Sequence, residues 1–409
     1  MPRSIELEEA HEILSKIVCP LLPESIPLAD ALGRITAHDL YAVCDLPPVP
    51  QAAVDGFAVV GSARAQRYQV VERPVDCNNW DLVLHSGQTA YVVTGGVLPQ
   101  GTQMVIPREQ VKVTGGEIVF SGEFVSGSNI KRCGEDFRHG ELLVSKGTCL
   151  SAGLIGLLAA FGYMEIPVFR CPKVLVLSIG TQIVPYNRIP KTDETRDSNG
   201  LLLASLVKRE RGRVIAVEVV GKQNTGELLP HLIKLFEQSD LVITTGGTFA
   251  TTNGEARVLL EKMGAKQLFS EVQLKPGGHV GAAVWNSKPV VLLSGNPAAC
   301  LVGFELFAVP VLRSLQGLSP VLNRIRARCL NPYSKKRGVR CFLRGHARCS
   351  EKGWTIDFLP GQKPSMMRSF LGCNALIDIP PNHPPLREGD EVSIILLDPN
   401  AGGLAGYLT

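Results

Sequence analysis

The sequence predicts a multi-domain protein in which an α/β domain with a parallel or mixed sheet lies between β-rich segments. Three observations lead to this prediction. The chain has 409 residues, which is too long for one ordinary hydrophobic core. Apolar runs of strand length alternate with amphipathic helical patterns between residues 172 and 317, as they do in parallel sheets that are covered on both faces. Short strand patterns broken by Gly and Pro precede and follow that region.

The amino-terminal part combines two helices with a small β-domain. Residues 5–18 show helical periodicity with acidic residues early in the segment. The prolines of "CDLPPVPQ" then impose an extended, turn-rich path. From residue 55 to about 124, short strands alternate with glycine turns. A second helix is predicted over 151–161, with Ser151 as its N-cap.

The central region predicts a ligand pocket as well as a sheet. The strands are predicted at "KVLVLSIG", "RVIAVEVVG", "DLVITTGG" and "PVVLLSGNP", and the helices at 201–211, 226–237 and 255–263. Three of the four strands end in a glycine turn. Because open α/β sheets bind ligands beyond the carboxyl ends of their strands, we expect a shared pocket there, with independent structural turns as the alternative. Residues 321–409 return to short strands, which predicts a compact closing β-domain.

Composition restricts the class of partner. The net charge of +4 suits an anionic small molecule and does not indicate nucleic acid. The basic cluster in 324–348, centred on residues 335–337, is interpreted as a solvated turn between strands. Eleven scattered cysteines without a CxxC pair predict free thiols in a reducing compartment. The first residues do not resemble a signal peptide, and the apolar window over 154–168 is too short for a bilayer, so a cytoplasmic protein without a membrane partner is expected.

Candidate chemistry rests on loop acids and one lysine, because the sequence has no nucleophile elbow, Walker loop or dinucleotide fingerprint. Asp55 follows the proline-rich bend, and Gly56 permits a tight turn beside it. Asp136 lies between two arginines, where a surface ion pair is the alternative, and Asp197 precedes a helix, where capping is the alternative. Lys275, in "QLKPGGH", suits a phosphate or another oxyanion, or is simply solvated.

Eight motifs in order resemble one family, the molybdopterin molybdenumtransferases, which include the bacterial MoeA proteins and the E domain of gephyrin. The motifs are "AAVDGFAV", "VVTGGVLPQGTQMVI", "NIKRCGEDF", "VLSIGTQIV", "RDSNG", "ITTGG", "KPGG" and "LSGNPA". The resemblance covers essentially the whole chain and implies an elongated four-domain subunit. The implied domains are a split helical domain I (1–43 plus 130–170), an inserted β-domain II (44–129), a molybdopterin-binding α/β domain III (171–320) and a C-terminal β-barrel domain IV (321–409).

The resemblance also implies an activity. Family members insert molybdate into adenylylated molybdopterin with Mg²⁺ and release AMP. They are homodimers whose active site lies between subunits, and a MogA-like adenylyltransferase is an expected partner. Two alternatives stay open at this point: a binding or scaffold paralogue that retains molybdopterin without inserting metal, and a transferase with altered chemistry on a related pocket.

Carried onto this chain residue by residue, the resemblance implies a set of site residues. Asp55 and Thr94 would approach from the partner subunit with Asp136 nearby, and Lys275 would act on the oxyanion. The residues implied for the pterin and its phosphates are Ser178, Gly180, Asp197, Asn199, Thr245, Gly246, Gly247, Ser294, Gly295, Asn296 and Pro297. Those implied for molybdate beside Lys275 are Pro276, Gly277, Arg340 or Arg344, and Ser365.

Several positions depart from the family pattern. Thr181 and Gln182 replace an Asp-Glu pair, Gly254 takes the place of an acid, and Gly278 replaces a second lysine. Two further departures are Ala299 for a serine and Gln103 for an acid. Because Mg²⁺ prefers carboxylate and phosphate oxygens, these changes predict weaker Mg²⁺ binding, and the sequence assigns no metal ligands. Loss of one charge-assisted hydrogen bond costs about 1.5–3 kcal/mol, so the oxyanion is expected to bind less tightly.

Overall fold

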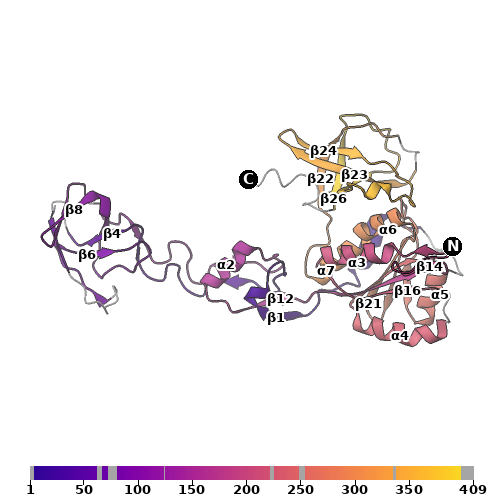
Figure 1. Cartoon of the computed structure of the whole chain (residues 1–409), viewed down its shortest axis with the longest axis horizontal. Helices are drawn as coiled ribbons and strands as arrows, with labels where there is room; N and C mark the ends of the chain where they lie inside the picture. The colour runs from indigo at the N-terminus through magenta and orange to yellow at the C-terminus, as the bar shows by residue number, and fades with distance from the viewer. Residues whose placement is uncertain are drawn as a thin grey trace. The chain divides into compact units, whose positions relative to one another are not determined.

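The computed structural model describes residues 4–61, 67–71, 81–123, 125–221, 225–247, 254–334 and 338–397. Figure 1 shows the elements coloured along the chain. The chain separates into two compact units, of which the first comprises Met1–Ser25, Gly33–Ala37 and Pro167–Thr409. The second comprises Ile26–Leu32 and His38–Ile166. Strands β1 (Pro23–Pro27) and β12 (Glu165–Phe169) contain residues at which the chain passes from one unit to the other. The four-domain boundaries therefore stay a prediction.

The second unit contains the predicted small β-domain. Its sheet has the strand order β7-β4-β6-β5-β9-β8. The strands are β4 (Gly56–Val59), β5 (Arg67–Val70), β6 (Gln88–Val92), β7 (Met104–Pro107), β8 (Val111–Thr114) and β9 (Glu117–Phe120). Two short antiparallel pairs accompany the sheet: β10 (Ile130–Lys131) with β3 (Gln51–Ala52), and β11 (Leu142–Val144) with β2 (Leu40–Tyr41).

The same unit contains one of the predicted helices. Helix α2 spans Ala152–Ala160, and Ser151 is its N-cap, because its hydroxyl accepts a hydrogen bond from Leu154 N at 3.4 Å. Both the helix and its cap confirm the sequence prediction. The cap satisfies one of the N–H groups that the first helical turn leaves without an intrahelical acceptor.

The first unit is built on a mixed sheet with the order β16-β13-β17-β21-β20-β18. The four predicted strands are neighbours in parallel register. They are β13 (Lys173–Ile179), β16 (Arg213–Val220), β17 (Leu241–Gly246) and β21 (Lys288–Leu293). Strands β20 (Gly281–Trp285) and β18 (Lys266–Phe269) extend the sheet in antiparallel register, and the strand patterns did not predict them.

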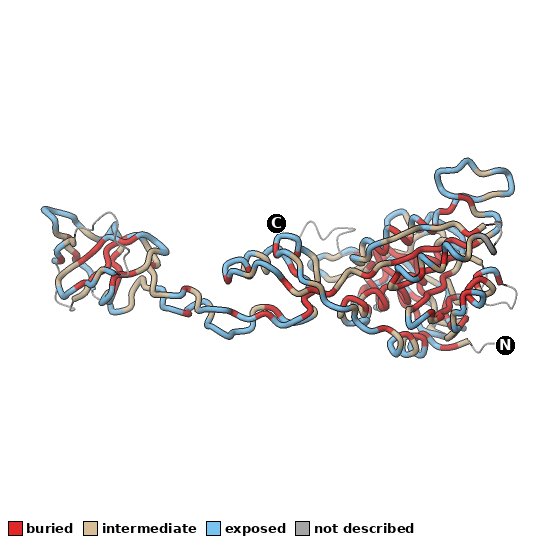
Figure 2. Tube along the Cα trace, turned by 90° about the horizontal axis from the view of Figure 1, so that it is seen from below, coloured by how far each residue is buried: buried red, intermediate tan, exposed pale blue. Residues whose placement is uncertain are grey.

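Both faces of this sheet are covered, as predicted. Along β13, Val174 and Val176 belong to one core cluster, whereas Leu175 and Leu177 belong to the other. The helices α3 (Asn199–Arg209), α4 (Thr225–Gln238) and α5 (Glu255–Lys262) match the three predicted helices. Figure 1 shows α4 and α5 on the face opposite to α3, and Figure 2 shows the buried residues concentrated in this part of the unit.

A long apolar helix, which the sequence patterns did not predict, follows β21. It consists of α6 (Pro297–Gly303), the π-helical turn η4 (Phe304–Ala308) and α7 (Val309–Leu315). By length and composition alone it could cross a membrane, but 89% of the window is buried inside the protein. Helix α1 (Leu7–Ser15) packs into the same core cluster, within the predicted 5–18 segment.

The carboxyl-terminal strands close into a barrel, as the resemblance implies. The five strands pair in the cycle β22-β24-β23-β25-β26 and back to β22. Their bounds are β22 (Arg324–Cys329), β23 (Arg340–Ser350), β24 (Gly353–Phe358), β25 (Ala375–Ile379) and β26 (Glu391–Leu396). The short strand β19 (Leu274–Lys275) leaves the α/β part and joins β23 in parallel register. The segment around Lys275 is therefore held against the barrel.

Candidate functional site

The three glycine turns meet at one edge of the mixed sheet. In the register of β13 and β17, Ser178 lies opposite Thr245 and Ile179 lies opposite Gly246. In the register of β17 and β21, Thr245 lies opposite Leu293, the residue before Ser294. The prediction that these turns share one sheet edge is therefore confirmed.

Backbone packs directly against backbone at this edge, which explains the glycines. Gly246 has φ +80°, and a Cβ there would lie 2.3 Å from the carbonyl oxygen of Ile179. A Cβ on Gly295 would lie 3.0 Å from Cα of Gly246. Any larger residue at Gly246 would have to move the end of β13 and adopt a backbone conformation that L-residues rarely take.

Asn199, the first residue of α3, connects the ends of β17 and β21 at this edge. Its side-chain Nδ2 donates to Thr245 Oγ1 and to Gly295 O, both at 2.9 Å. Thr245 Oγ1 in turn donates to Ser294 O at 3.0 Å. Because a carbonyl oxygen can only accept, the contact with Gly295 fixes which way the Asn199 amide faces. The start of α3 is thereby hydrogen-bonded to the ends of β17 and β21.

Two buried polar atoms at this edge have no hydrogen-bond partner among the described residues. They are the hydroxyl oxygen of Ser178 and Oδ1 of Asn199. Because the amide orientation is fixed, Oδ1 is left as an acceptor. Buried polar groups are normally satisfied by protein, water or ligand, so these two atoms mark the edge as a place where polar groups of a ligand would be stabilised.

Asp197 caps the helix that carries Asn199. Its Oδ1 accepts a hydrogen bond from Gly200 N at 2.8 Å, and the residue is 6% exposed. The capping alternative is therefore confirmed.

At the start of α6, Asn296 N donates to Ser294 Oγ at 3.3 Å and Ala298 N donates to Pro364 O at 3.0 Å. A loop of the barrel thus contacts the helix that begins at Pro297.

The loop after the double glycine lies largely outside the described residues. Residues 248–253 are in this group, and so are residues 335–337 of the basic cluster. Gly254, the first described residue after the loop, precedes α5 with φ −64° and ψ 133°. These are ordinary dihedral angles for any residue at a helix N-cap.

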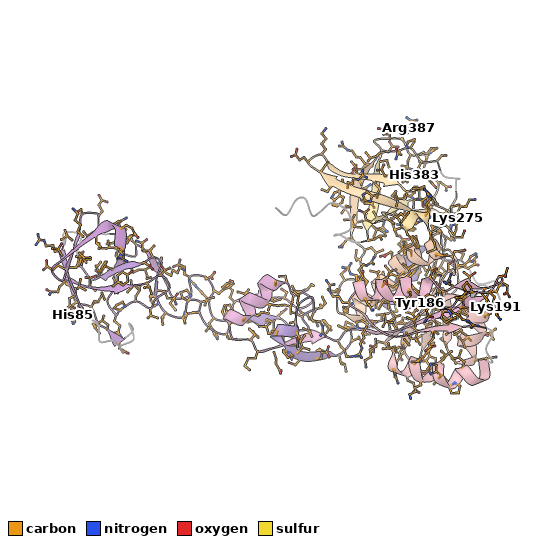
Figure 3. All side chains as sticks on the ribbon, in the orientation of Figure 1. His85, Tyr186, Lys191, Lys275, His383 and Arg387 are labelled. Carbon is orange, nitrogen blue, oxygen red and sulfur yellow. The ribbon has the colours of Figure 1, made fainter. Side chains whose placement is uncertain are left out.

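A cavity of about 710 Å³ surrounds Lys275, where β19 lies against the barrel. Lys275 is exposed and in register with Cys341. Figure 3 labels Lys275 near the barrel. The polar and ionisable residues that line the cavity are Ser4, Glu271, Gln273, Lys275, His279, Tyr333, Ser334, Cys341 and Gln362. Pro276, Gly277 and Gly278 complete the bend that carries Lys275 into this cavity.

Neither Arg340 nor Arg344, the two arginines of β23 that the resemblance implies for molybdate, is among the residues that line this cavity. Arg340 forms two hydrogen bonds to Asp378, at 2.7 and 2.6 Å, and a third to Glu8 at 2.6 Å. Arg344 is fully buried, its Nε donates to Ser369 Oγ at 3.0 Å, and burial lowers the pKa of its guanidinium.

Arg344 instead holds the loop that borders the cavity. It donates to the carbonyl oxygen of Gly361 at 2.8 Å, and Gln362 Nε2 donates to the carbonyl oxygen of Arg344 at 2.8 Å. Ser365 is exposed, one residue after Pro364, which lines the cavity.

The second unit places Asp55 and Thr94 together. Thr94 donates to Asp55 Oδ1 from its backbone N at 2.6 Å and from its hydroxyl at 2.7 Å. These two hydrogen bonds hold the pKa of the Asp55 carboxyl below its ordinary value. Asp136 is exposed in a turn in which its N–H donates to Leu46 O at 3.0 Å. The unit therefore presents a preformed, charged Asp55–Thr94 pair.

Two acidic residues are described at or beside the sheet edge: Asp197, and Glu255, whose neighbour Ala256 donates from its N–H to Gly247 O at 2.8 Å. Within the described parts of the chain, no three His, Cys, Asp or Glu side chains are grouped so as to hold a metal ion. Asp197 is buried and one of its carboxylate oxygens accepts a hydrogen bond from Gly200 N, whereas Glu255, the first residue of α5, is exposed. Mg²⁺ is usually held by one or two carboxylates together with substrate phosphates and waters, so a group of three protein ligands is not required for it. The ten described cysteines are free, which confirms the prediction of free thiols for those positions.

Three family models match the chain. They are the MoeA N-terminal region (domain I and II) over residues 5–162, the probable molybdopterin binding domain over 175–314, and the MoeA C-terminal region (domain IV) over 326–397. The chain belongs to the MoeA family.

Individual MoeA relatives match over nearly the full length. A molybdopterin molybdenumtransferase of Staphylococcus aureus (strain Mu50) is 26% identical over 385 residues, which is 92% of each protein. One of Staphylococcus epidermidis is 26% identical over 405 residues, covering 97% of this chain and 96% of the relative. Two solved structures of a molybdopterin biosynthesis MoeA protein from Pyrococcus horikoshii match with TM-scores of 0.82 and 0.80. Their identities are 29% and 26%, and they cover 97% and 96% of this chain and 100% of their own.

The MoeA resemblance located the glycine turns and Lys275, but it did not identify the other side of the cavity. Glu271, His279, Tyr333 and Gln362 line it, although they lie in three separate segments of the sequence. No motif connects them, because only the pairing of β19 with β23 brings these segments together. A weak signal existed for His279, which directly follows the "KPGG" motif.

Proposed function

We propose that this MoeA family member acts in molybdenum cofactor biosynthesis, inserting molybdate into adenylylated molybdopterin with release of AMP. The observation that carries the proposal is the sheet edge that Asn199 fixes, with its unpartnered Ser178 hydroxyl and Asn199 Oδ1. Beside it, in the same unit, Lys275 lines a cavity of about 710 Å³. Backbone N–H groups at glycine turns can bind the phosphate of a pterin, and the ammonium group of a lysine can bind the molybdate oxyanion.

Each group has a role in this proposal. The turns at Gly180, Gly246–Gly247 and Ser294–Pro297 hold the pterin and its phosphates, and Asn199 keeps the second and third of these turns in place. Lys275 orients molybdate, with Pro276 and Gly277 shaping the bend and Ser365 as an exposed hydroxyl nearby. Arg344 acts by holding the Gly361–Lys363 loop rather than by contacting the oxyanion, because its guanidinium is buried and hydrogen-bonded to that loop. Arg340 is a weaker candidate for binding the oxyanion, because its guanidinium already donates hydrogen bonds to Asp378 and Glu8.

Three further parts of the proposal concern partners and cofactor. The active protein is a homodimer to which the partner contributes Asp55 and Thr94, with Asp136 close by. A MogA-like adenylyltransferase supplies the substrate in the cytoplasm. Mg²⁺ remains an expectation from the resemblance, and no step is assigned to it.

The test is a turnover assay. Purified protein is mixed with adenylylated molybdopterin and molybdate, and AMP is measured, with Lys275→Ala as the matched variant. We expect AMP from the wild type and at least tenfold less from the variant, a factor that corresponds to about 1.4 kcal/mol. Tight retention of the pterin without AMP would instead support the binding paralogue. If the protein neither releases AMP nor retains the pterin, both functions are rejected.

A further inference from the structure

The amino-terminal segment supports one side of β19, the strand that carries Lys275. Ile5 N donates a hydrogen bond to Glu271 O at 3.1 Å, and Gln273 N donates back to Ile5 O at 2.8 Å. Strand β19 itself has 2 residues. Its position therefore depends on the segments beside it, because so short a strand forms few ladder hydrogen bonds of its own.

The barrel supports the other side of β19. Leu274 is in parallel register with Arg340, the first residue of β23, and Lys275 is in register with Cys341. Strand β19 thus lies between the amino-terminal segment and the barrel, and the backbone at Lys275 follows the separation of these two parts.

The bend that follows β19 lies against the sheet edge where the glycine turns meet. A Cβ on Gly277 would lie 3.1 Å from the carbonyl oxygen of Ala299, which is in the first turn of α6. A shift of β19 would therefore also change the distance between Lys275 and the turn at Ser294–Pro297.

Glu8 joins the two supports of β19 through Arg340. Glu8 lies in the first turn of α1, just after Ile5, and its Oε1 accepts a hydrogen bond from Arg340 Nη1 at 2.6 Å. Arg340 is fixed on the barrel by the buried Asp378, which accepts from its Nε at 2.7 Å and from its Nη2 at 2.6 Å. The ion pair between Glu8 and Arg340 therefore holds the start of β23 to the segment that contains Ile5.

We propose that Glu8 is a positioning residue for Lys275: through Arg340 it keeps the barrel and the amino-terminal segment together and so fixes β19 relative to the sheet edge. The inference rests on the proposed function, which assigns the oxyanion to Lys275. Glu8 is not among the described residues that line the Lys275 cavity, so it acts through Arg340 and not by contact with the oxyanion. A displacement of a reacting group by about 1 Å is enough to slow a reaction strongly.

The first arm of the experiment measures hydrogen exchange in the full-length protein without ligand. Glu8→Gln removes the charge and keeps the size of the side chain. We expect the amides of residues 271–278 to exchange about two- to fivefold faster, the factor expected from the loss of one partly exposed ion pair. Glu9→Gln is the matched control, because Glu9 is also an exposed acid of the first turn of α1 and forms no ion pair among the described residues. It should leave the exchange of residues 271–278 unchanged.

The second arm measures AMP release at limiting molybdate, with protein in excess over adenylylated molybdopterin so that slow variants still give a rate. Glu8→Gln should lower this rate about two- to fivefold in the otherwise wild-type protein. It should have no effect in the Lys275→Ala background, because two changes that act through the same group are not additive. A general loss of stability would instead lower the rate by the same factor in both backgrounds.

Equal factors in the two backgrounds would overturn the inference, and so would unchanged exchange of residues 271–278 in Glu8→Gln. These failures differ from failure of the proposed function. If the wild type releases AMP and Glu8→Gln behaves like Glu9→Gln in both arms, only the role of Glu8 is lost. If the wild type releases no AMP, the proposed function is rejected, and the positioning of Lys275 for that reaction is rejected with it.

Discussion

Replacing Asn199 by Ala should loosen the sheet edge and weaken ligand binding there. The side chain is 7% exposed and makes two hydrogen bonds of 2.9 Å, to Thr245 Oγ1 and to Gly295 O. Thr245 keeps a partner after the change, because its hydroxyl still donates to Ser294 O. Gly295 O loses the Asn199 donor, so its turn is no longer connected to α3.

The structure sets the size of the effect. Two buried hydrogen bonds contribute roughly 0.5–1.5 kcal/mol each, so the free energy of unfolding should fall by about 1–3 kcal/mol. The unpartnered Oδ1 is removed at the same time, which reduces the loss. We therefore expect a value in the middle of this range, and substrate affinity should fall by at least tenfold, about 1.4 kcal/mol.

Urea unfolding and an equilibrium binding measurement with adenylylated molybdopterin test this prediction. Ser205→Ala is the matched control, because Ser205 lies on the same helix and makes one exposed hydrogen bond, to Leu201 O. It should change stability by less than about 0.5 kcal/mol and leave binding unchanged. If Asn199→Ala behaves like Ser205→Ala in both measurements, Asn199 does not fix the edge.

Three other changes follow from the described geometry. Gly254→Asp combined with Thr181→Asp should raise Mg²⁺-dependent AMP release, since Gly254 already has N-cap dihedral angles that suit Asp; an unchanged Mg²⁺ titration of AMP formation would contradict this. Asp55→Asn should lower AMP release and leave the melting temperature unchanged, because the carboxylate is exposed. The Thr94 hydrogen bonds lower the pKa of the Asp55 carboxyl, so NMR titration of the wild type should find it still charged at pH values below the range in which an ordinary Asp is protonated. Burial raises the pKa of Glu305 from 4.5 to about 7, so between these pH values the folded state holds a proton that the unfolded state releases, and the free energy of unfolding should fall as the pH rises. In Glu305→Gln the free energy of unfolding should lack this dependence on pH, and an identical dependence would refute the assignment.

Much of the fold could be predicted from the spacing of apolar residues in the sequence. The strands β13, β17 and β21 are apolar because they are buried on both faces, and such runs can be recognised in the sequence. The edge strand β16 is only partly buried but has the same apolar pattern. The long helix Pro297–Leu315 was missed because it is apolar on all sides, which leaves no 3.6-residue pattern to detect. Strands β18 and β20 were missed because they are short and extend an otherwise parallel sheet in antiparallel register.

The site was predictable to the extent that it depends on glycine. Close approach of Gly246 to Ile179 and of Gly295 to Gly246 requires the absence of Cβ, and this requirement appears in the sequence as strands that end in Gly. The roles of the barrel arginines were not predictable. Which partners Arg344 has depends on side-chain packing in three dimensions: its Nε donates to Ser369 Oγ and its Nη2 to Gly361 O, whereas Nη1 has no partner among the described residues.

The central claim is that the three turns at the sheet edge hold the anionic pterin. The most direct measurement is a crystal structure of the protein with bound molybdopterin. The account predicts phosphate density against the backbone of Gly246–Gly247 or of Ser294–Pro297, with the pterin within hydrogen-bonding distance of Ser178 or Asn199. Density for the compound at another surface, with these turns unchanged and empty, would contradict it.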